Sequence, residues 1–192
     1  VVKKILERKE DIFLSVSCTT RAPRAGETEG ESYYYISKEE FEKRIKEGYF
    51  IEWERYVDNY YGTPKSYVEQ ELAKGKDVIL EIEMQGALKI KAKYPDSVLV
   101  FITPPTVEEL IRRLRNRGTE TEEVICKRLE KATMEAEGIE AYDYILVNDN
   151  LDKTVKHLNY LIQDQHMRVS NQIRFLEDIR GQLRANYAYM NK

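Results

Sequence analysis

The sequence predicts an α/β fold with a parallel-sheet core. Two short apolar runs rich in β-branched residues, Asp77–Glu83 and Ser97–Ile102, flank a segment with helical spacing. A strand–helix–strand unit of this kind joins parallel strands. Two further apolar runs, Ile12–Ser17 and Tyr144–Val147, are predicted to add buried strands to the same core.

The remaining elements follow from periodicity and from turn-forming residues. In the first half we expect a helix at 1–9, strand 12–17, a loop at 18–30, a strand at 33–36, a helix from Ser37 to Gly48, a strand at 50–56, a turn at 59–64 and a helix at 65–74. After strand 97–102 we expect helices at 106–115 and 122–137, strand 144–147 and a long helix at 152–169. Helical spacing continues at Ile173, Leu176, Ile179 and Leu183, but we expect the last nine residues to be irregular.

Composition restricts the class of protein. The 192 residues suffice for one domain with a small inserted lobe. With 42% hydrophobic and 34% charged residues and a net charge of −3, nothing favours a general surface for nucleic acid or membrane. No run approaches the roughly 20 apolar residues that span a bilayer. Cys18 and Cys126 lie far apart, which predicts no disulfide framework and no zinc site, and a reducing, cytosolic compartment.

The first candidate site follows strand 12–17, where Arg21 and Arg24 lie three residues apart in a loop stiffened by Pro23. Ligands of open α/β sheets bind beyond the carboxyl ends of strands. Two guanidinium groups there suit a phosphate, because each can donate two charge-assisted hydrogen bonds. Spacing alone leaves open a solvated loop with two surface arginines.

The second candidate site is Phe50-Ile51-Glu52-Trp53, followed by Asn59-Tyr60-Tyr61-Gly62-Thr63. A carboxylate only accepts hydrogen bonds, and guanine presents a ring N–H and an amino group side by side. Glu52 could therefore select guanine over adenine. An outward-facing strand glutamate, and tyrosines that merely pack, remain open alternatives.

Two further groups could serve phosphoryl transfer. Glu81 and Glu83 end an apolar strand, where phosphotransferases place a carboxylate near Mg²⁺, although a strand end that meets solvent has the same pattern. Five arginines lie within seventeen residues and are interrupted by a glycine: Arg112, Arg113, Arg115, Arg117 and Arg128. Such a pair of helices could close as a lid over phosphates, or could be a solvated face with i,i+4 ion pairs.

Together these segments resemble guanylate kinases. Six motifs occur in that family's order and spacing across about residues 1–165: Ser-x-Ser-x-Thr-Thr-Arg-x-x-Arg-x-Gly-Glu, Phe-Ile-Glu-Trp, Tyr-Tyr-Gly-Thr, Met-Gln-Gly, Arg-Gly-Thr-Glu and Val-Asn-Asp. The resemblance implies a P-loop kinase-like parallel sheet with an inserted GMP-binding lobe and a helical lid. It implies core at 1–17, the GMP lobe at 18–80, core at 81–112, the lid at 113–140, and core with a C-terminal helical extension at 141–192.

The resemblance also implies roles for single residues. Arg21, Arg24, Tyr33 and Tyr61 match residues that hold the GMP phosphate. Ser17, Glu52 and Thr63 match residues around guanine, where Glu83 is a further candidate. Glu81 matches an acid associated with magnesium, Arg113, Arg117 and Arg128 match lid arginines, and Asn148 lies where the family approaches adenine. The implied reaction moves the γ-phosphate of ATP to GMP, with Mg²⁺ carried by ATP and no direct protein metal site.

Two departures from the family's pattern stand out. Gly-x-x-x-x-Gly-Lys-Ser/Thr, the ATP phosphate loop, occurs nowhere in the sequence, and residues 1–9 match the helix that follows it. We therefore expect about 15–25 further residues upstream that contain the loop, and little transfer activity without them. Residues after about 166 extend past the family's usual end. A non-catalytic interaction domain related to guanylate kinases, and a kinase for another nucleoside monophosphate, remain alternatives at this stage.

Overall fold

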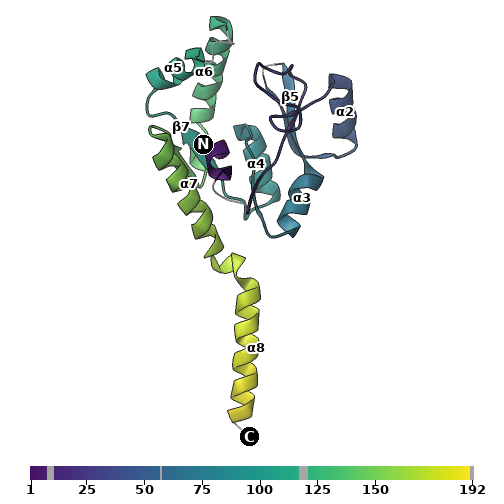
Figure 1. The fold of residues 1–192 in the computed structure, drawn as a ribbon, viewed down its shortest axis with the longest axis vertical. Coiled ribbons are helices and arrows are strands. Elements are labelled where there is room, and N and C mark those ends of the chain that lie inside the picture. The colour runs from purple at the N-terminus through teal and green to yellow at the C-terminus, as the bar shows by residue number, and fades with distance from the viewer. Residues whose placement is uncertain (8–10, 57, 117–120, 191–192) are drawn as a thin grey trace.

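An α/β body carries one long helix that projects from it (Figure 1). The computed structural model describes residues 1–7, 11–56, 58–116 and 121–190. Within these ranges the body contains two pairs of parallel strands and one mixed, mainly antiparallel sheet. The predicted α/β class with parallel strands is confirmed.

The parallel pairs differ from the predicted strand–helix–strand unit. Strand β1 (Ile12–Leu14) pairs with β6 (Asp77–Ile79), and β7 (Val100–Thr103) pairs with β8 (Tyr144–Val147). Helix α4 (Met84–Lys93) connects β6 to β7, but in the described residues these two strands belong to separate sheets. The paired strands are shorter than the predicted apolar runs. In the run Asp77–Glu83, for example, residues 80–83 lie outside the hydrogen-bonded ladder and lead directly into α4.

The core beside these strands is built by helices from the two ends of the chain. Helix α1 (Val2–Leu6) supplies Ile5, and α7 (Leu151–His166) supplies Val155 and Leu158. Both pack with Ile12 and Leu146 in one buried cluster. The amphipathic spacing of both helices thus reflects their burial against the strands.

A second lobe follows β1. Its four-stranded sheet has the order β3 (Tyr34–Tyr35), β2 (Cys18–Thr19), β5 (Asn59–Pro64), β4 (Phe50–Tyr56). Helices α2 (Lys38–Lys46) and α3 (Lys65–Ala73) lie beside it (Figure 1). Helix α2 begins where predicted, because the Ser37 side chain accepts a hydrogen bond from the backbone N–H of Glu40.

Two sequence predictions in this lobe were wrong. Residues 59–64 form a central strand and not a turn, and the predicted loop 18–30 begins with strand β2. Gly62 suggested the turn, but its role is close packing. A Cβ atom there would lie 2.9 Å from Phe41 Cζ and 3.0 Å from Trp53 Cβ. The glycine therefore lets β5 approach the aromatic core of the lobe.

On the other side of α4 in Figure 1 lie α5 (Val107–Asn116) and α6 (Glu122–Ala136), which carry Arg112, Arg113, Arg115 and Arg128 of the arginine cluster. Thr106 and Thr121 cap their N-termini by accepting hydrogen bonds from Glu109 and Val124. A single 3₁₀ turn, Ile139–Ala141, follows α6 and leads to β8.

After α7 and a 3₁₀ turn (Val169–Asn171), helix α8 (Ile173–Met190) extends away from the body (Figure 1). The last nine residues were expected to be irregular, but α8 runs to Met190, because the apolar helical spacing continues beyond Leu183 through Tyr187. Within the described residues, no helix combines the length and the apolar character needed to cross a membrane.

Candidate functional site

A buried carboxylate lies where β4 and β5 pair. Glu52 is opposite Thr63 in the ladder, and its exposed fraction is only 6%. The Thr63 hydroxyl donates to Glu52 Oε1 over 2.6 Å, and Ser17 Oγ lies 3.4 Å from Thr63 Oγ1. The resemblance assigned these three side chains to guanine. They come from β4, β5 and the segment before β2, and in the structure they lie together.

Burial raises the pKa of Glu52 above its ordinary value, while hydrogen bonds from the Thr63 side chain and backbone oppose that rise. The other carboxylate oxygen faces α4. A Cβ atom on Gly86 would lie 2.6 Å from Glu52 Oε2 and 3.3 Å from Cδ. Only a glycine leaves Glu52 in this position. Gly86 was noted in the sequence only as part of Met-Gln-Gly and received no role.

The arginine loop is organised by Glu27, whose role the sequence did not reveal. Arg21 Nη2 donates to both Glu27 carboxylate oxygens, at 2.8 and 2.9 Å. The Arg24 backbone N–H and the Tyr35 hydroxyl also donate to Glu27, at 2.8 and 2.7 Å. Burial works to raise the pKa of Glu27, but these hydrogen bonds outweigh it and hold the pKa below its usual range. The loop is therefore fixed around one carboxylate.

Aromatic rings complete this end of the lobe. The Arg21 guanidinium lies 5.5 Å from the centre of the Tyr33 ring, and the Tyr33 and Tyr61 rings meet edge to face at 5.9 Å. Burial raises the pKa of Tyr33, and the charge of Glu81 adds to the rise. Glu81 is exposed in the extended segment between β6 and α4. Arg21, Tyr33, Tyr61 and Glu81 thus gather at one place, although they come from distant parts of the sequence.

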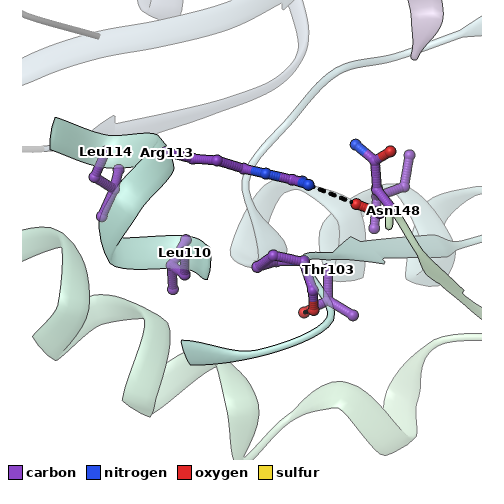
Figure 2. Close-up of a pocket in the computed structure, with 7 residues that line it drawn as sticks. Thr103, Leu110, Arg113, Leu114 and Asn148 are labelled. Carbon is purple, nitrogen blue, oxygen red and sulfur yellow. Dashed lines mark hydrogen bonds between the residues drawn. The ribbon is translucent and has the colours of Figure 1, made fainter. Parts of the chain in front are cut away.

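A separate pocket brings Arg113 and Asn148 together. Arg113 Nη2 donates to the backbone oxygen of Asn148 over 2.8 Å (Figure 2). The pocket has a volume of about 170 Å³ and is otherwise lined by β7, the segment after it and α5, through Ile102, Thr103, Pro104, Leu110 and Leu114. Its mixture of apolar walls and a few polar groups is typical of small-molecule sites.

Glu109 holds Arg113 in this pocket. Its Oε1 accepts from Arg113 Nε over 2.6 Å, and the carboxylate also pairs with Arg112. These hydrogen bonds, from Arg112 first and Arg113 second, lower the pKa of Glu109 to about 2. Arg113 is therefore oriented before any ligand binds.

Helix α6 faces both the lobe and α4. Lys131 Nζ lies 3.7 Å from the centre of the Tyr56 ring and donates to Glu83 Oε2 over 2.8 Å. The Arg128 guanidinium lies 5.6 Å from the same ring. Glu83 is thus paired with α6, and its association with guanine stays a prediction. Arg117, the remaining candidate lid arginine, lies outside the described residues.

Transfer of a phosphoryl group requires positioned positive charge on both sides of the transferred group. The described residues place arginines on the lobe and on α5 and α6, around a parallel-strand core. The architecture is that of an α/β nucleotide phosphotransferase.

Comparison with known proteins specifies the family. The guanylate kinase family model matches residues 1–165. A guanylate kinase from Caldanaerobacter subterraneus subsp. tengcongensis is 46% identical over 88% of this chain and 82% of its own length. One from Lactococcus lactis subsp. lactis is 49% identical over 88% of this chain and 83% of its own length. A crystal structure of guanylate kinase from Anaplasma phagocytophilum matches with a TM-score of 0.79 at 35% identity, over 93% of this chain and 88% of that one.

This chain belongs to the guanylate kinase family. Guanylate kinases are ATP:GMP phosphotransferases, and they transfer phosphate from ATP with the help of a divalent metal ion. The matches span most of the chain and are named as enzymes, so they support catalysis over the alternative of a non-catalytic interaction domain. The matches also identify GMP, and not another nucleoside monophosphate, as the phosphate acceptor of this family.

Proposed function

We propose that this chain phosphorylates GMP with Glu52 as the residue that reads guanine. The observation that carries the proposal is the buried Glu52–Thr63 pair. A buried carboxylate is unfavourable unless something donates to it. The ring N–H and the amino group of guanine supply two adjacent donors, whereas adenine presents no such pair. Ser17 and Thr63 add hydroxyls beside the same carboxylate.

The phosphate of GMP would be held by Arg21, Arg24, Tyr33 and Tyr61. Support comes from the arrangement around Glu27, which fixes the Arg21 guanidinium and the Arg24 backbone before a ligand arrives. Ordered donors lose less entropy on binding than mobile ones do. Guanidinium groups and tyrosine hydroxyls would together neutralise and orient the phosphate that accepts the transferred group.

ATP would approach from the opposite side. The pocket between Arg113 and Asn148 suits the adenine end, and Arg113, Arg117 and Arg128 would close on the phosphates as the lid at 113–140 moves. The lobe that binds GMP would comprise residues 18–80. Residues 1–17, 81–112 and 141–192 would form the core and its C-terminal extension.

Mg²⁺ would travel with ATP. Magnesium is commonly held by one or two carboxylates together with substrate phosphates, and a single exposed carboxylate such as Glu81 suits that role. Within the described ranges, no cluster of three or more potential ligands forms a dedicated metal site. The ion supplies charge stabilisation for the transferred phosphoryl group. Glu81 lies close to Tyr33 and Arg21 and would position the ion at that end of the site.

The substrates and the two free cysteines fit a cytosolic location, which we propose on that basis. The proposed partners are therefore ATP and GMP, with no nucleic acid or membrane.

Calorimetric titration tests the assignment of the base. GMP, IMP, which lacks the amino group, and AMP are titrated into the parent protein and into Glu52→Gln. We expect GMP to bind most tightly to the parent. The variant should bind GMP more weakly by about 1–3 kcal/mol, because an amide N–H₂ faces guanine donors. Glu47→Gln, an exposed change at the end of α2, is the control. Equal GMP affinity in Glu52→Gln and the parent contradicts the proposal.

A further inference from the structure

Helix α8 is long, regular and almost without contact to the body. It spans 18 residues, none of them buried, and Figure 1 shows it pointing away from the rest of the molecule. Large apolar side chains on it are open to solvent, with exposed fractions of 65% for Leu183 and 73% for Tyr187. The helix also lies beyond residues 1–165, which the family model matches. The family model therefore assigns no role to this helix.

Six of the apolar residues of α8 lie along one stripe, whereas Phe175 and Tyr189 lie outside it. At about 100° per residue, six apolar positions fall within roughly one third of the helix circumference. They are Ile173, Leu176, Ile179, Leu183, Tyr187 and Met190. The opposite face carries Arg174, Asp178 and Ala185. Such a stripe is the pattern of a helix that packs along its whole length against another surface.

An unsupported helix of this length is only marginally stable in water, since most helical stability in proteins comes from packing of the apolar face. A membrane surface would favour a polar face dominated by Lys and Arg. In α8 three arginines are balanced by one glutamate and one aspartate, for a net charge of +1. Its mixed charge fits a protein surface better than an anionic bilayer.

We propose that α8 binds the α8 helix of a second copy of this chain in an antiparallel, two-fold symmetric pair. In such a pair the same flank of each helix faces the other copy, because the symmetry makes the interface isologous. That flank carries Glu177 and Arg184, with Arg180 beside them within the edge of the stripe, whereas the other flank has no charged residue beside the stripe. A parallel pair would place the charged flank against the uncharged one.

The antiparallel arrangement also matches the charges. With the two-fold axis between Arg180 and Gly181, Glu177 of each copy lies opposite Arg184 of the other. The axis then gives two identical ion pairs. The Arg180 side chains of the two copies meet between them, each one turn after the Glu177 of its own copy. Along the seam, the apolar side chains of the two copies alternate, with Ile179 and Leu183 on either side of the axis. The same sequence thus supplies both halves of the contact.

The first test measures the mass of the full chain by sedimentation velocity, from about 1 to about 200 µM, the range of modest interfaces. We expect twice the monomer mass of 22.7 kDa at the upper end. Leu183→Glu should weaken the dimer about a hundredfold or more, because it buries an unpaired charge in the seam. Ala185→Glu adds the same charge on the opposite face and should leave dimerisation unchanged.

A charge exchange tests the orientation. Arg184→Glu alone places like charges together and should weaken the dimer about tenfold. Adding Glu177→Arg to that variant should restore the affinity of the parent. A parent that stays monomeric at all concentrations, Leu183→Glu that still dimerises, or an exchange that fails to restore association overturns the proposal. Binding of the monomer to vesicles with 30% anionic lipid, without dimerisation, also overturns it.

Discussion

Glu52 shows how a single residue can be unfavourable for the empty protein and useful for the proposed function. Burial raises its pKa because the ionised form loses water. Guanine would replace that water with two directed donors. The cost of burying the carboxylate in the free protein is thus the source of selectivity, since a ligand without those donors leaves the carboxylate with only the hydrogen bonds from Thr63.

The raised pKa of Glu52 predicts a pH dependence of GMP binding. Protonated Glu52 presents a donor where guanine also donates, so GMP affinity should fall as the pH is lowered from 8 towards 5. GMP titrates in this range as well, and comparison with Glu52→Gln removes that contribution. We expect the difference in affinity between parent and variant to shrink at low pH by calorimetry. A difference that is constant with pH contradicts this assignment.

The same residue affects the stability of the protein without GMP. Because the pKa of Glu52 is raised by folding, its contribution to stability is fully present below the unfolded pKa and is lost as the pH rises through the folded pKa. We therefore expect Glu52→Gln to melt at a higher temperature than the parent at pH 8. The advantage should disappear at pH 4, where both side chains are neutral.

A substitution at Gly86 also tests the position of Glu52, because it can distinguish a lost contact with guanine from a general loss of structure. Gly86→Ala would place a methyl group 2.6 Å from Glu52 Oε2, so Glu52 must shift. We expect the preference for GMP over IMP to decrease in titrations, because the shifted carboxylate no longer accepts from the amino group. A purely structural effect would weaken both ligands equally. Gly181→Ala, which has no neighbour within 4 Å, is the control for helix propensity.

Sequence reasoning reached Glu52, Thr63 and Ser17 through motif resemblance, and the structure brings the three together. It could not reach Gly86 or Glu27. A helix glycine that is required by a carboxylate on a distant strand leaves no local pattern. Glu27 lies inside a quoted motif, but its four hydrogen bonds depend on how the loop folds back. Contacts between distant segments are the part that spacing alone does not encode.

At the scale of elements, the loop between β2 and β3 is held by Glu27. Glu27→Gln keeps one acceptor oxygen but loses the charge shared by Arg21, Arg24 and Tyr35. We expect GMP affinity to fall by about 1–2 kcal/mol, since hydrogen bonds to charged groups contribute more than neutral ones. Calorimetry on this variant, with the exposed Glu31→Gln of the same loop as control, measures the effect. Unchanged affinity would show that Arg21 is ordered without Glu27.

Element prediction succeeded where periodicity was regular and failed where packing overruled residue type. The Ser37 cap and the strand Phe50–Tyr56 were located correctly because their signals are local. The strand Asn59–Pro64 was missed because its Asn and Gly residues resemble a turn. In the structure Gly62 is required by Phe41 and Trp53, which lie on an adjacent helix and strand. A turn residue inside a strand can therefore mark close packing.

The whole molecule divides into a catalytic body that buries its helices and an appended helix that does not. Helix α7 buries Thr154, Val155 and Leu158 against the core, whereas α8 buries no residue. The family resemblance ends close to this division. The body and α8 therefore have separate sources of stability: a packed core for one, and the proposed second copy for the other.

That division predicts the effect of truncation. A chain that ends at Gln172 keeps α7 and loses α8. We expect the melting temperature of its body to match that of the full chain within about 2 °C by scanning calorimetry, because 1 kcal/mol corresponds to about 2–4 °C at this size. Val155→Ala in α7 is the matched contrast. Val155 is 1% exposed in the core cluster, and its truncation to Ala should lower the melting temperature by several degrees. If removal of α8 lowers the melting temperature as much as Val155→Ala does, α8 packs against the body in solution, and its apolar stripe is then not available to a second copy.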